Sequence, residues 1–440
     1  MPNMFIKQII NRIKGEKKRE RARIEIEELK RALLNDPEFR EGILRELEYR
    51  TGRRDLLKAG VLGLLGLAVG GAAGAGAAAV GNETAIETIS DYTGVRIPKP
   101  CTAIVAQDGT GDYDVLPNED ASEAIQRAID YAHGRGGGKV LIREGDYKIY
   151  NTIELRHPVN LEGEGGMYTH PTYTVHGTIL KGKNVLKISL PKSTYGIIIK
   201  NLAIDGIDRS STGIEINSAH CNIENISIVR CNEALILNRA WTSEFRSINA
   251  MLNNVGCNVT GTGTSLLVFV KCQFSCNYDK GMIINGGHSI TLLGCSLEYN
   301  SKWGLSIESS SARAINIIGS YFEMNPNSRY GGTKGGHIQI GTDSSHPSVI
   351  NIEGCTLGSL DPSDIIVEAS RIYIRHGYSI NIKGNLFYQP KGQPARIDIN
   401  NQHGFGNIVV ENNRYIHDKG PVFVGQDKML INEVLSSYST

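Results

Sequence analysis

Three carboxylates in this 440-residue sequence stand where acid and base chemistry is expected. Glu233, Asp279 and Glu308 each flank a short apolar segment that opens with glycine or alanine. Glu233 and Asp279 occupy corresponding positions two repeats apart, which places them about 10 Å apart if equivalent residues stack about 5 Å apart. Carboxyl groups about 6.5–9.5 Å apart are typical of inverting glycosidases, and carboxyl groups about 5 Å apart of retaining ones. We therefore predict these three residues as catalytic, with a solvated turn acid as the alternative for each.

Cations, an amide and aromatic rings accompany these acids. Cationic groups can hold a carboxylate, and aromatic faces can stack on sugar rings. The predicted substrate-binding residues are Arg239, Lys280, Asn285, His288, Tyr299 and Trp303. A solvated amide at a strand end remains the alternative for Asn285. No metal or other cofactor is expected, because no cluster of His and Cys has ligand spacing.

The elements that position these residues are short repeats. Between Gly196 and His417 an apolar strand, a small residue and a second apolar strand recur about nine times. The small marker residues are 22 to 35 residues apart: Asn201, Asn225, Ser247, Cys272, Cys295, Ser320, Cys355, Asn385 and Asn412. A period in the twenties, with no room for a helix, indicates a β-solenoid. We predict an all-β parallel β-helix with three strands per coil and about nine to eleven coils.

Each repeat contains a further strand, opened by a small residue such as Gly213 or Gly281. Alternate side chains of a strand point to opposite faces, so outward columns are expected. One predicted column is Glu215, Ile236, Asn258, Ile283, Ser306, Gln339, Ile366 and Asp398. The next is Asn217, Asn238, Thr260, Asn285, Glu308, Gly341, Glu368 and Asn400. The marker residues should form an internal ladder at one bend, and the residues predicted to point inward are Ile226, Leu297, Phe322 and Leu357.

The segment 103–166 resembles the opening of the pectate-lyase-like (pectin lyase fold) superfamily, in particular its rhamnogalacturonase and epimerase-like group. The resemblance is carried by AIQRAID (124–130), GDY (145–147) and LEGEG (161–165). It implies a right-handed β-helix, in agreement with the crossover rule. The apolar spacing of residues 121–132 predicts a one-faced helix that caps the N-terminal end of the solenoid.

The resemblance also implies a carbohydrate-active protein that acts on acidic polysaccharide, by glycosidic hydrolysis or β-elimination. Calcium would enter only by analogy with the family. No complete catalytic set of the superfamily is present, so a non-catalytic β-helix that binds glycans, or forms a cell-surface or virion fibre, is the rival hypothesis. Two longer repeats insert residues 326–336 and 361–378, which either wall a cleft or are tolerated surface loops.

The N-terminal region has its own signals. Residues 51–58 (TGRRDLLK), followed by 22 uncharged residues, resemble a twin-arginine export signal, with Ala77 to Ala79 as the peptidase site. The alternative is an uncleaved anchor, since residues 59–80 are long enough to span a bilayer. We expect an exported, extracellular or cell-surface protein, either released or tethered to the membrane through this segment.

The predicted organisation is a charged helical extension (1–52), a signal or anchor (53–80), a linker (81–102), the β-helix (103–420) and a C-terminal cap or tail (421–440). Residues 80–440 carry 31 Lys and Arg against 35 Asp and Glu, which argues against a nucleic-acid partner. Most of the eight cysteines are expected to be small buried residues. Cys221 and Cys231, in a turn region expected to be exposed, are the one pair predicted as a candidate disulfide.

Overall fold

A computed structural model describes residues 101–168, 175–183, 188–192, 195–330, 332, 334–358, 370–388, 395–399, 407–416 and 421–424. The chain divides into two units, Met1–Lys99 and Pro100–Thr440, and the described residues belong to the second. The predicted helical extension and the signal or anchor segment lie outside the described residues. Of the helices in the described part, none is long and apolar enough to cross a membrane.

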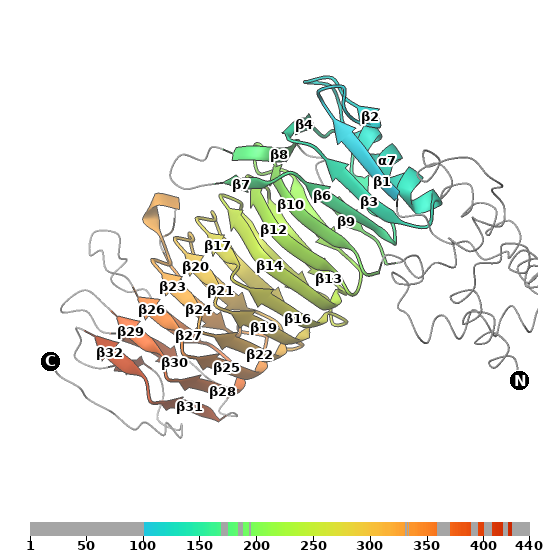
Figure 1. The fold of residues 1–440 in the computed structure, drawn as a ribbon. Helices are drawn as coiled ribbons and strands as arrows, with labels where there is room; N and C mark the ends of the chain where they lie inside the picture. Colours follow the sequence, from blue (N-terminus) through green and yellow to red (C-terminus); the bar gives the residue numbers. More distant parts are fainter. Residues whose placement is uncertain are drawn as a thin grey trace, which may run out of the picture. The chain divides into compact units, whose positions relative to one another are not determined.

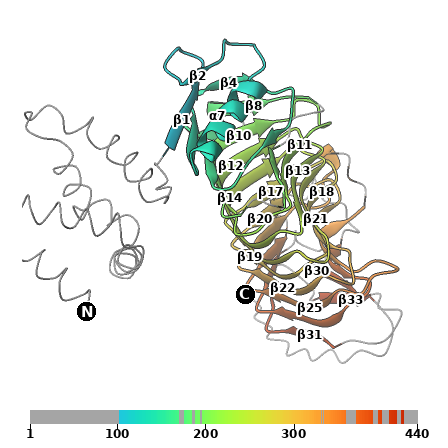
Figure 2. The ribbon, with the colours of Figure 1, turned by 90° about the vertical axis from the view of Figure 1, so that its right-hand side faces the viewer.

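The fold is a right-handed parallel β-helix, as predicted (Figure 1). An 11-stranded sheet, here called sheet B, consists of β5 (Ile153–Glu154), β9 (Ile188–Leu190), β11 (Thr212–Ile216), β13 (Glu233–Asn238), β15 (Val255–Thr260), β18 (Lys280–Asn285), β21 (Trp303–Ile307), β24 (Gly336–Ile340), β27 (Ser370–Ile374), β30 (Ala395–Ile399) and β33 (Pro421–Val424). Figure 2 shows many of these strands stacked along the solenoid. Sheet B thus continues past residue 420, where the sequence placed the end of the solenoid.

A 22-stranded sheet, here called sheet A, covers the other two faces of each coil. Its first face contains β1 (Cys101–Ala106), β2 (Tyr113–Asp114), β3 (Gly138–Ile142), β6 (Val159–Gly163), β10 (Ile198–Asp205), β12 (Asn222–Val229), β14 (Trp241–Met251), β16 (Ser265–Val270), β19 (His288–Leu293), β22 (Arg313–Ile318), β25 (Ser348–Glu353), β28 (Tyr378–Lys383) and β31 (Ile408–Glu411). Its second face contains β4 (Gly145–Lys148), β7 (Gly166–Tyr168), β8 (Val175–Lys181), β17 (Gln273–Ser275), β20 (Ser296–Glu298), β23 (Tyr321–Glu323), β26 (Thr356–Gly358), β29 (Leu386–Tyr388) and β32 (Arg414–Ile416). The strands β10, β12 and β14 run across both faces, and a short 3-10 helix, η1 (Ser328–Tyr330), follows β23.

A single left-handed residue in each coil makes the bend between the two faces of sheet A. The residues at this bend have φ between 51° and 64°: Asn201, Asn225, Ser247, Lys271, Gly294, Gly319, Gly354, Gly384 and Asn412. Glycine and asparagine adopt this conformation at the lowest cost. The next residue along the chain points inward, as Cys272, Cys295 and Asn385 do.

The predicted marker ladder is therefore wrong in part, because it joins two neighbouring positions. Asn201, Asn225, Ser247 and Asn412 lie at the left-handed bend, whereas the other five markers are the buried residues that follow it. A shift of one residue moves a side chain to the opposite face of a strand. The buried member of the last coil is Asn413, whose Oδ1 accepts from the Asn385 amide.

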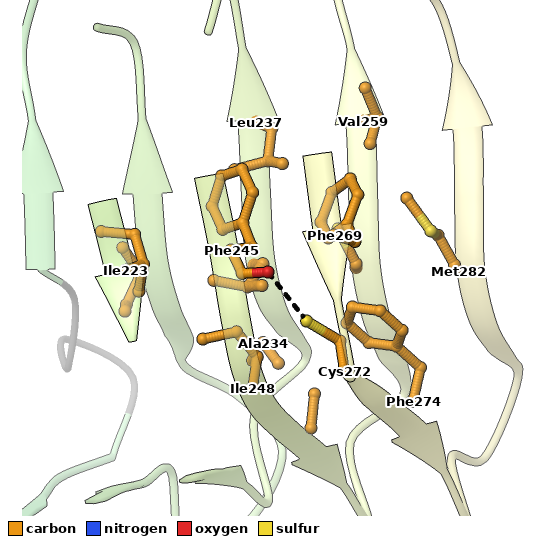
Figure 3. Close-up of a cluster of buried hydrophobic side chains, with 14 of the residues drawn as sticks. Ile223, Ala234, Leu237, Phe245, Ile248, Val259, Phe269, Cys272, Phe274 and Met282 are labelled. Carbon is orange, nitrogen blue, oxygen red and sulfur yellow. Dashed lines mark hydrogen bonds between the residues drawn. The ribbon is translucent and has the colours of Figure 1, made fainter. Parts of the chain in front are cut away.

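The core is a continuous stack of apolar side chains inside the coils. Figure 3 shows Phe245, Phe269 and Phe274 within it. The rings of Phe245 and Phe269 stack with centroids 4.8 Å apart, and Phe274 meets Phe269 edge-on. The four residues predicted to point inward are all at most 1% exposed, which confirms the prediction: Ile226, Leu297, Phe322 and Leu357.

A buried asparagine ladder explains why the strands of sheet B open with a small residue. Asn253, Asn277, Asn300 and Asn325 stack at the bend before sheet B and are at most 1% exposed. The Oδ1 atoms of the last three each accept from the backbone N–H of the preceding member. A Cβ at Gly281 would lie 2.6 Å from the Gly304 carbonyl oxygen and 2.8 Å from Asn300 Nδ2. Only glycine therefore fits between this ladder and the next coil.

Helix α7 (Ser122–Gly134) lies where the sequence predicted a helix, against β1 and β3 (Figures 1 and 2). Ile125, Ala128 and Ile129 are fully buried and join the same core as the coils. Its role in closing the N-terminal end of the solenoid stays a prediction.

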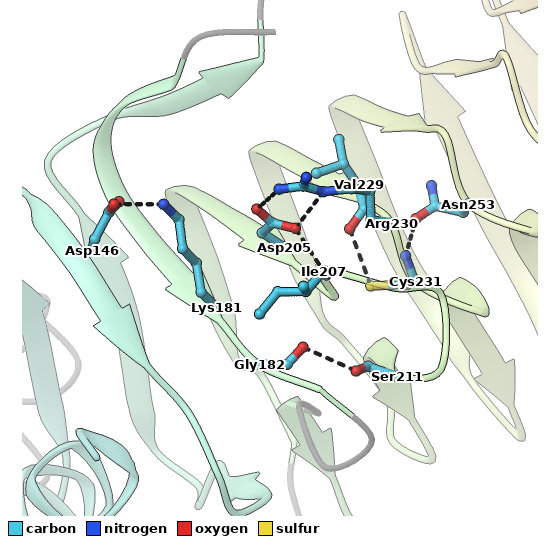
Figure 4. Close-up of polar contacts among 10 residues, drawn as sticks. All are labelled: Asp146, Lys181, Gly182, Asp205, Ile207, Ser211, Val229, Arg230, Cys231 and Asn253. Carbon is cyan, nitrogen blue, oxygen red and sulfur yellow. Dashed lines mark hydrogen bonds and ion pairs between the residues drawn. The ribbon is translucent and has the colours of Figure 1, made fainter. Parts of the chain in front are cut away.

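The region around Cys231 corrects the predicted disulfide. Cys221 and Cys231 are free thiols, 2% and 0% exposed, so their turn is not exposed as predicted. Burial raises the pKa of both thiols, and Figure 4 shows the Cys231 thiol donating to the Val229 carbonyl. Beside it the buried Asp205 accepts from Arg230 Nε at 2.9 Å and from the Ile207 backbone N–H. This turn is a packed structural element with reduced cysteines.

Candidate functional site

The outward face of sheet B carries three columns of side chains, set by the parallel register. The opening column is Thr212, Glu233, Val255, Lys280, Trp303 and Gly336. The middle column is Ser189, Glu215, Ile236, Asn258, Ile283, Ser306, Gln339, Tyr373 and Asp398. The closing column contains Asn238, Thr260 and Asn285 in register, with Glu308, Gly341 and Arg375 directly after the paired strand ends of the following coils.

Two members of the predicted columns are therefore wrong. Ile366 and Glu368 lie outside the described residues, and register gives their column positions to Tyr373 and Arg375. The residues inserted in this repeat lengthen it, so the sequence spacing predicts the column positions seven residues too early.

Four polar side chains, three on β18, β21 and β24 and one directly after β21, form a hydrogen-bonded cluster, here called the Lys280 cluster. Lys280 Nζ lies 2.5 Å from Glu308 Oε1. Ser306 Oγ is 2.7 Å from the same oxygen and 3.2 Å from Gln339 Oε1. The Lys280 and Glu308 side chains are 17% and 23% exposed, so each remains reachable from solvent. The cluster presents a cation and a carboxylate to solvent beside the partly exposed Gln339 amide, and the buried Ser306 hydroxyl donates to the carboxylate.

An aromatic pair borders the Lys280 cluster. Trp303 pairs with Lys280 in register, and its ring stacks on Tyr373 with centroids 6.0 Å apart and an interplanar angle of 23°. The strand between them, β24, has Gly336 beside Trp303. A ring surface of this kind, next to polar groups, suits the apolar face of a sugar.

Glu233 and Asp279 do not occupy equivalent positions, contrary to the sequence prediction. Glu233 pairs with Val255, which pairs with Lys280, so Asp279 is one residue out of register. Glu233 Oε1 accepts from Asn258 Nδ2 at 2.6 Å. Asp279 Oδ1 lies 2.8 Å from Lys302 Nζ at the turn. The error arose because two adjacent polar residues precede both Ala234 and Gly281, so the sequence pattern left the register ambiguous by one residue.

Glu308 lies too far from the other two predicted acids to form a glycosidase pair with either of them. Glu233 and Glu308 are three coils apart, or about 14 Å. Asp279 precedes its strand and Glu308 follows the next one, so about six residues, or roughly 20 Å, separate them along the strand direction. Both values exceed the roughly 6.5–9.5 Å of inverting enzymes.

The predicted substrate-binding residues other than Lys280 and Trp303 lie in different parts of the solenoid. Asn285 is exposed in the closing column, near the Lys280 cluster. His288 begins β19 on sheet A, where its Nδ1 lies 3.4 Å from Ser289 Oγ. Tyr299 packs against a separate buried group that includes Tyr330. Arg239 lines a hollow at the end of β13. The structure thus brings Lys280, Glu308, Trp303 and Asn285 to one region of sheet B, but not His288 or Tyr299.

A buried pair of basic residues lies just beneath the aromatic border. His337, fully buried on β24, has Nδ1 3.4 Å from Asn325 Nδ2 and Nε2 3.3 Å from Arg371 Nη1. Burial, with the Arg371 cation second, holds the pKa of His337 well below its usual value. Burial also lowers the pKa of Arg371 to about 10. His337 therefore extends the asparagine ladder as a neutral imidazole.

Among comparisons with known proteins, only the comparison of structures gives matches. No family model matches the chain, and no curated protein matches its sequence. Among solved structures, the A-module of a mannuronan C-5 epimerase from Azotobacter vinelandii is 14% identical, with a TM-score of 0.52, over 76% of this chain and 100% of that one. DFA-IIIase from Arthrobacter chlorophenolicus is 13% identical, with a TM-score of 0.50, over 74% and 92%. A tailspike protein of the E. coli bacteriophage HK620, in complex with pentasaccharide, is 14% identical, with a TM-score of 0.50, over 74% and 66%.

These likenesses show the fold alone. The described residues contain no group of three or more His, Cys, Asp and Glu side chains able to hold a metal ion.

Several residues of this surface were not predicted as site residues. Ser306 and Gln339 stood in a predicted outward column, and their place on the strand of Trp303 and on the next strand was the signal that could have found them. Tyr373 was missed because the insertion before it displaced the count. Lys192, which lines the hollow with Arg239, lies before the regular repeats and carries no repeat signal.

Proposed function

We propose that this chain is a carbohydrate-active protein that binds acidic polysaccharide on the outward face of sheet B and cleaves it by β-elimination. The observation that carries the proposal is the Lys280 cluster beside the stacked rings of Trp303 and Tyr373. An ammonium group can bind a uronate carboxylate, and a ring can hold the neighbouring sugar. Two structural neighbours support a sugar polymer as ligand, since one is named for mannuronan and one was solved with a pentasaccharide.

The acid separations favour elimination over hydrolysis. Hydrolysis by two carboxylates needs a pair at most about 9.5 Å apart, and Glu308, the predicted acid of the Lys280 cluster, is farther than this from both Glu233 and Asp279. Elimination needs one base and one cation. In this reaction the base removes the proton from the ring carbon that bears the carboxylate, and a double bond forms to the neighbouring carbon as that carbon's bond to the glycosidic oxygen breaks. The oxygen leaves with its electron pair and takes a proton from water.

Lys280 and Glu308 take the two roles in this proposal. A substrate carboxylate competes with Glu308 for the Lys280 ammonium, which neutralises the charge that develops on the substrate. Glu308, released from Lys280, accepts the proton. Ser306 stays within hydrogen-bonding distance of Glu308 and orients it.

A non-catalytic glycan-binding protein is the second candidate. It is favoured by the direct contact between Lys280 and Glu308, which leaves the carboxylate engaged before any ligand arrives. In that case the same face binds a glycan and the acids serve only as hydrogen-bond acceptors.

An activity screen separates the two candidates. The full chain is incubated with a panel of polyuronates and neutral polysaccharides, and both reducing ends and the absorbance of unsaturated products are read. The proposal expects unsaturated products from wild type, a loss of about 100-fold or more for Glu308→Gln, and no loss for Glu353→Gln, an exposed acid on sheet A. Binding without any product would support the second candidate. Reducing ends without unsaturated products would refute elimination.

We also propose that the protein is exported through the paired arginines Arg53 and Arg54, and either released or tethered through residues 59–80. Twin-arginine receptors recognise the paired guanidinium groups, so replacing both by lysine should retain the protein in the cytoplasm. Cell fractionation measures the outcome, and unchanged export would exclude this route.

A further inference from the structure

A hollow of about 440 Å³ opens at the end of the first strands of sheet B. It is lined by Ser189, Pro191, Lys192, Asn217, Asn238, Arg239, Gly261 and Thr262. Gly261 has φ +82°, and a Cβ there would lie 2.6 Å from Asn238 Oδ1. The absence of a side chain at Gly261 therefore keeps this wall of the hollow open.

The charge of the hollow is positive. Lys192 and Arg239 line it, and neither forms an ion pair with an acid among the described residues. Glu215, the acid on the neighbouring strand, does not line the hollow, and its Oε1 accepts from Asn217 Nδ2 at 2.9 Å. The lining groups besides the two cations are amides and hydroxyls, which suit sugar hydroxyl groups.

The hollow and the Lys280 cluster lie on the same face of sheet B. The closing column connects them through Thr260 and Asn285, which lie in register between Asn238 and the coil of Glu308. From β13 to β21 there are three coil spacings, or about 14 Å. A short oligosaccharide laid along the solenoid axis spans this distance.

We infer that the hollow is a distal subsite that binds an anionic sugar unit, carboxylated or sulfated, of a glycan whose other end lies at the Lys280 cluster. This inference rests on the proposed function and adds to it a second, separate anion-binding position. Arg239 supplies a planar donor group suited to a carboxylate or sulfate, and Lys192 supplies a second charge. The subsite makes affinity depend on glycan length, because only a chain that reaches both positions gains both sets of contacts.

The test compares two double variants of the full chain that remove the same charges. Lys192→Gln with Arg239→Gln alters the hollow, and Lys271→Gln with Arg313→Gln removes one exposed lysine and one exposed arginine from sheet A. Binding is measured by titration calorimetry, after a glycan array identifies ligands, with uronate, sulfated and neutral oligosaccharides as disaccharides and pentasaccharides. All four residues are exposed, so both variants should fold, and circular dichroism checks this.

We expect wild type to bind an anionic pentasaccharide about tenfold more tightly than the disaccharide. The hollow variant should lose this gain and the sheet A variant should keep it. A preference for uronate or for sulfate identifies the group that is bound. Equal pentasaccharide affinity in wild type and the hollow variant would overturn the inference while leaving the proposed function intact. Absence of binding to every acidic glycan would overturn both.

Discussion

Replacement of Asn300 by alanine should strongly destabilise the solenoid, because it interrupts the buried asparagine ladder just before the strand that carries Trp303. Asn300 Oδ1 accepts from the backbone N–H and the Nδ2 of Asn277, both at 3.0 Å. Its Nδ2 lies 2.9 Å from the Phe274 carbonyl oxygen and 3.1 Å from Asn325 Oδ1.

The expected loss of stability depends on which buried polar groups lose a hydrogen-bond partner. The alanine variant leaves the Asn277 N–H and the Phe274 carbonyl short of the hydrogen bond that Asn300 made, and each buried unsatisfied group costs about 1–3 kcal/mol. Asn277 Nδ2 keeps the Ala250 carbonyl, and Asn325 Oδ1 keeps the backbone N–H of residue 300. The expected loss in the free energy of unfolding for these two groups is therefore about 2–6 kcal/mol.

The measurement is urea unfolding of the full chain, followed by far-UV circular dichroism. The matched control is Asn254→Ala, which removes one exposed amide contact, to Asn232 at 2.9 Å. It should cost about 1 kcal/mol or less. If Asn300→Ala were no less stable than Asn254→Ala, the argument that the ladder sustains the bend before sheet B would be refuted.

Three further predictions concern His337, Gly281 and Trp303. The pKa of His337 is depressed in the fold, so below about pH 6.5 only the unfolded state gains a proton and the free energy of unfolding should fall by up to about 1.4 kcal/mol per pH unit. The melting temperature, measured against pH, should decline less in a His337→Gln variant than in wild type. An identical pH profile for the two proteins would contradict this prediction. Gly281→Ala should cost about 2–3 kcal/mol in urea unfolding, because its Cβ meets the next coil, whereas Gly294→Ala, with φ +60° and open space, should cost only about 1 kcal/mol. In calorimetry, Trp303→Ala should weaken glycan binding by about 1–2 kcal/mol, whereas Tyr373→Phe, which keeps the stacked ring, should leave the affinity unchanged. Equal affinities of the two variants would exclude a role of the stacked rings in glycan binding.

The solenoid could be predicted from the sequence because its determinants are local. Whether a side chain points inward depends on alternation within its own strand, and a repeated apolar pattern therefore predicts the core directly. The burial of Ile226, Leu297, Phe322 and Leu357 illustrates this. The helix at Ser122–Gly134 could be predicted for the same reason, from its 3.6-residue apolar spacing.

Register between coils could not be predicted as reliably. Small residues occur both at the left-handed bend and at the buried position after it, so the sequence pattern groups Asn201 and Cys272 in one ladder although they lie one position apart. Repeats of unequal length added a second error, which placed Ile366 where Tyr373 belongs. The hydrogen bonds between coils decide which residues of neighbouring coils pair, and the spacing of residues along the sequence does not reveal these hydrogen bonds.

The sequence alone therefore determined which residue types were available for chemistry and that they would be carried on stacked parallel strands. Only the tertiary structure decided which of them meet. Lys280 and Glu308 are 28 residues apart and form an ion pair across neighbouring strands. Glu233 and Asp279, which looked equivalent in the sequence, differ by one position in register and have different partners, Asn258 and Lys302. The physical reason is that the residue type alone determines that a side chain carries a carboxylate, whereas the hydrogen-bond register between coils determines which partner that carboxylate contacts.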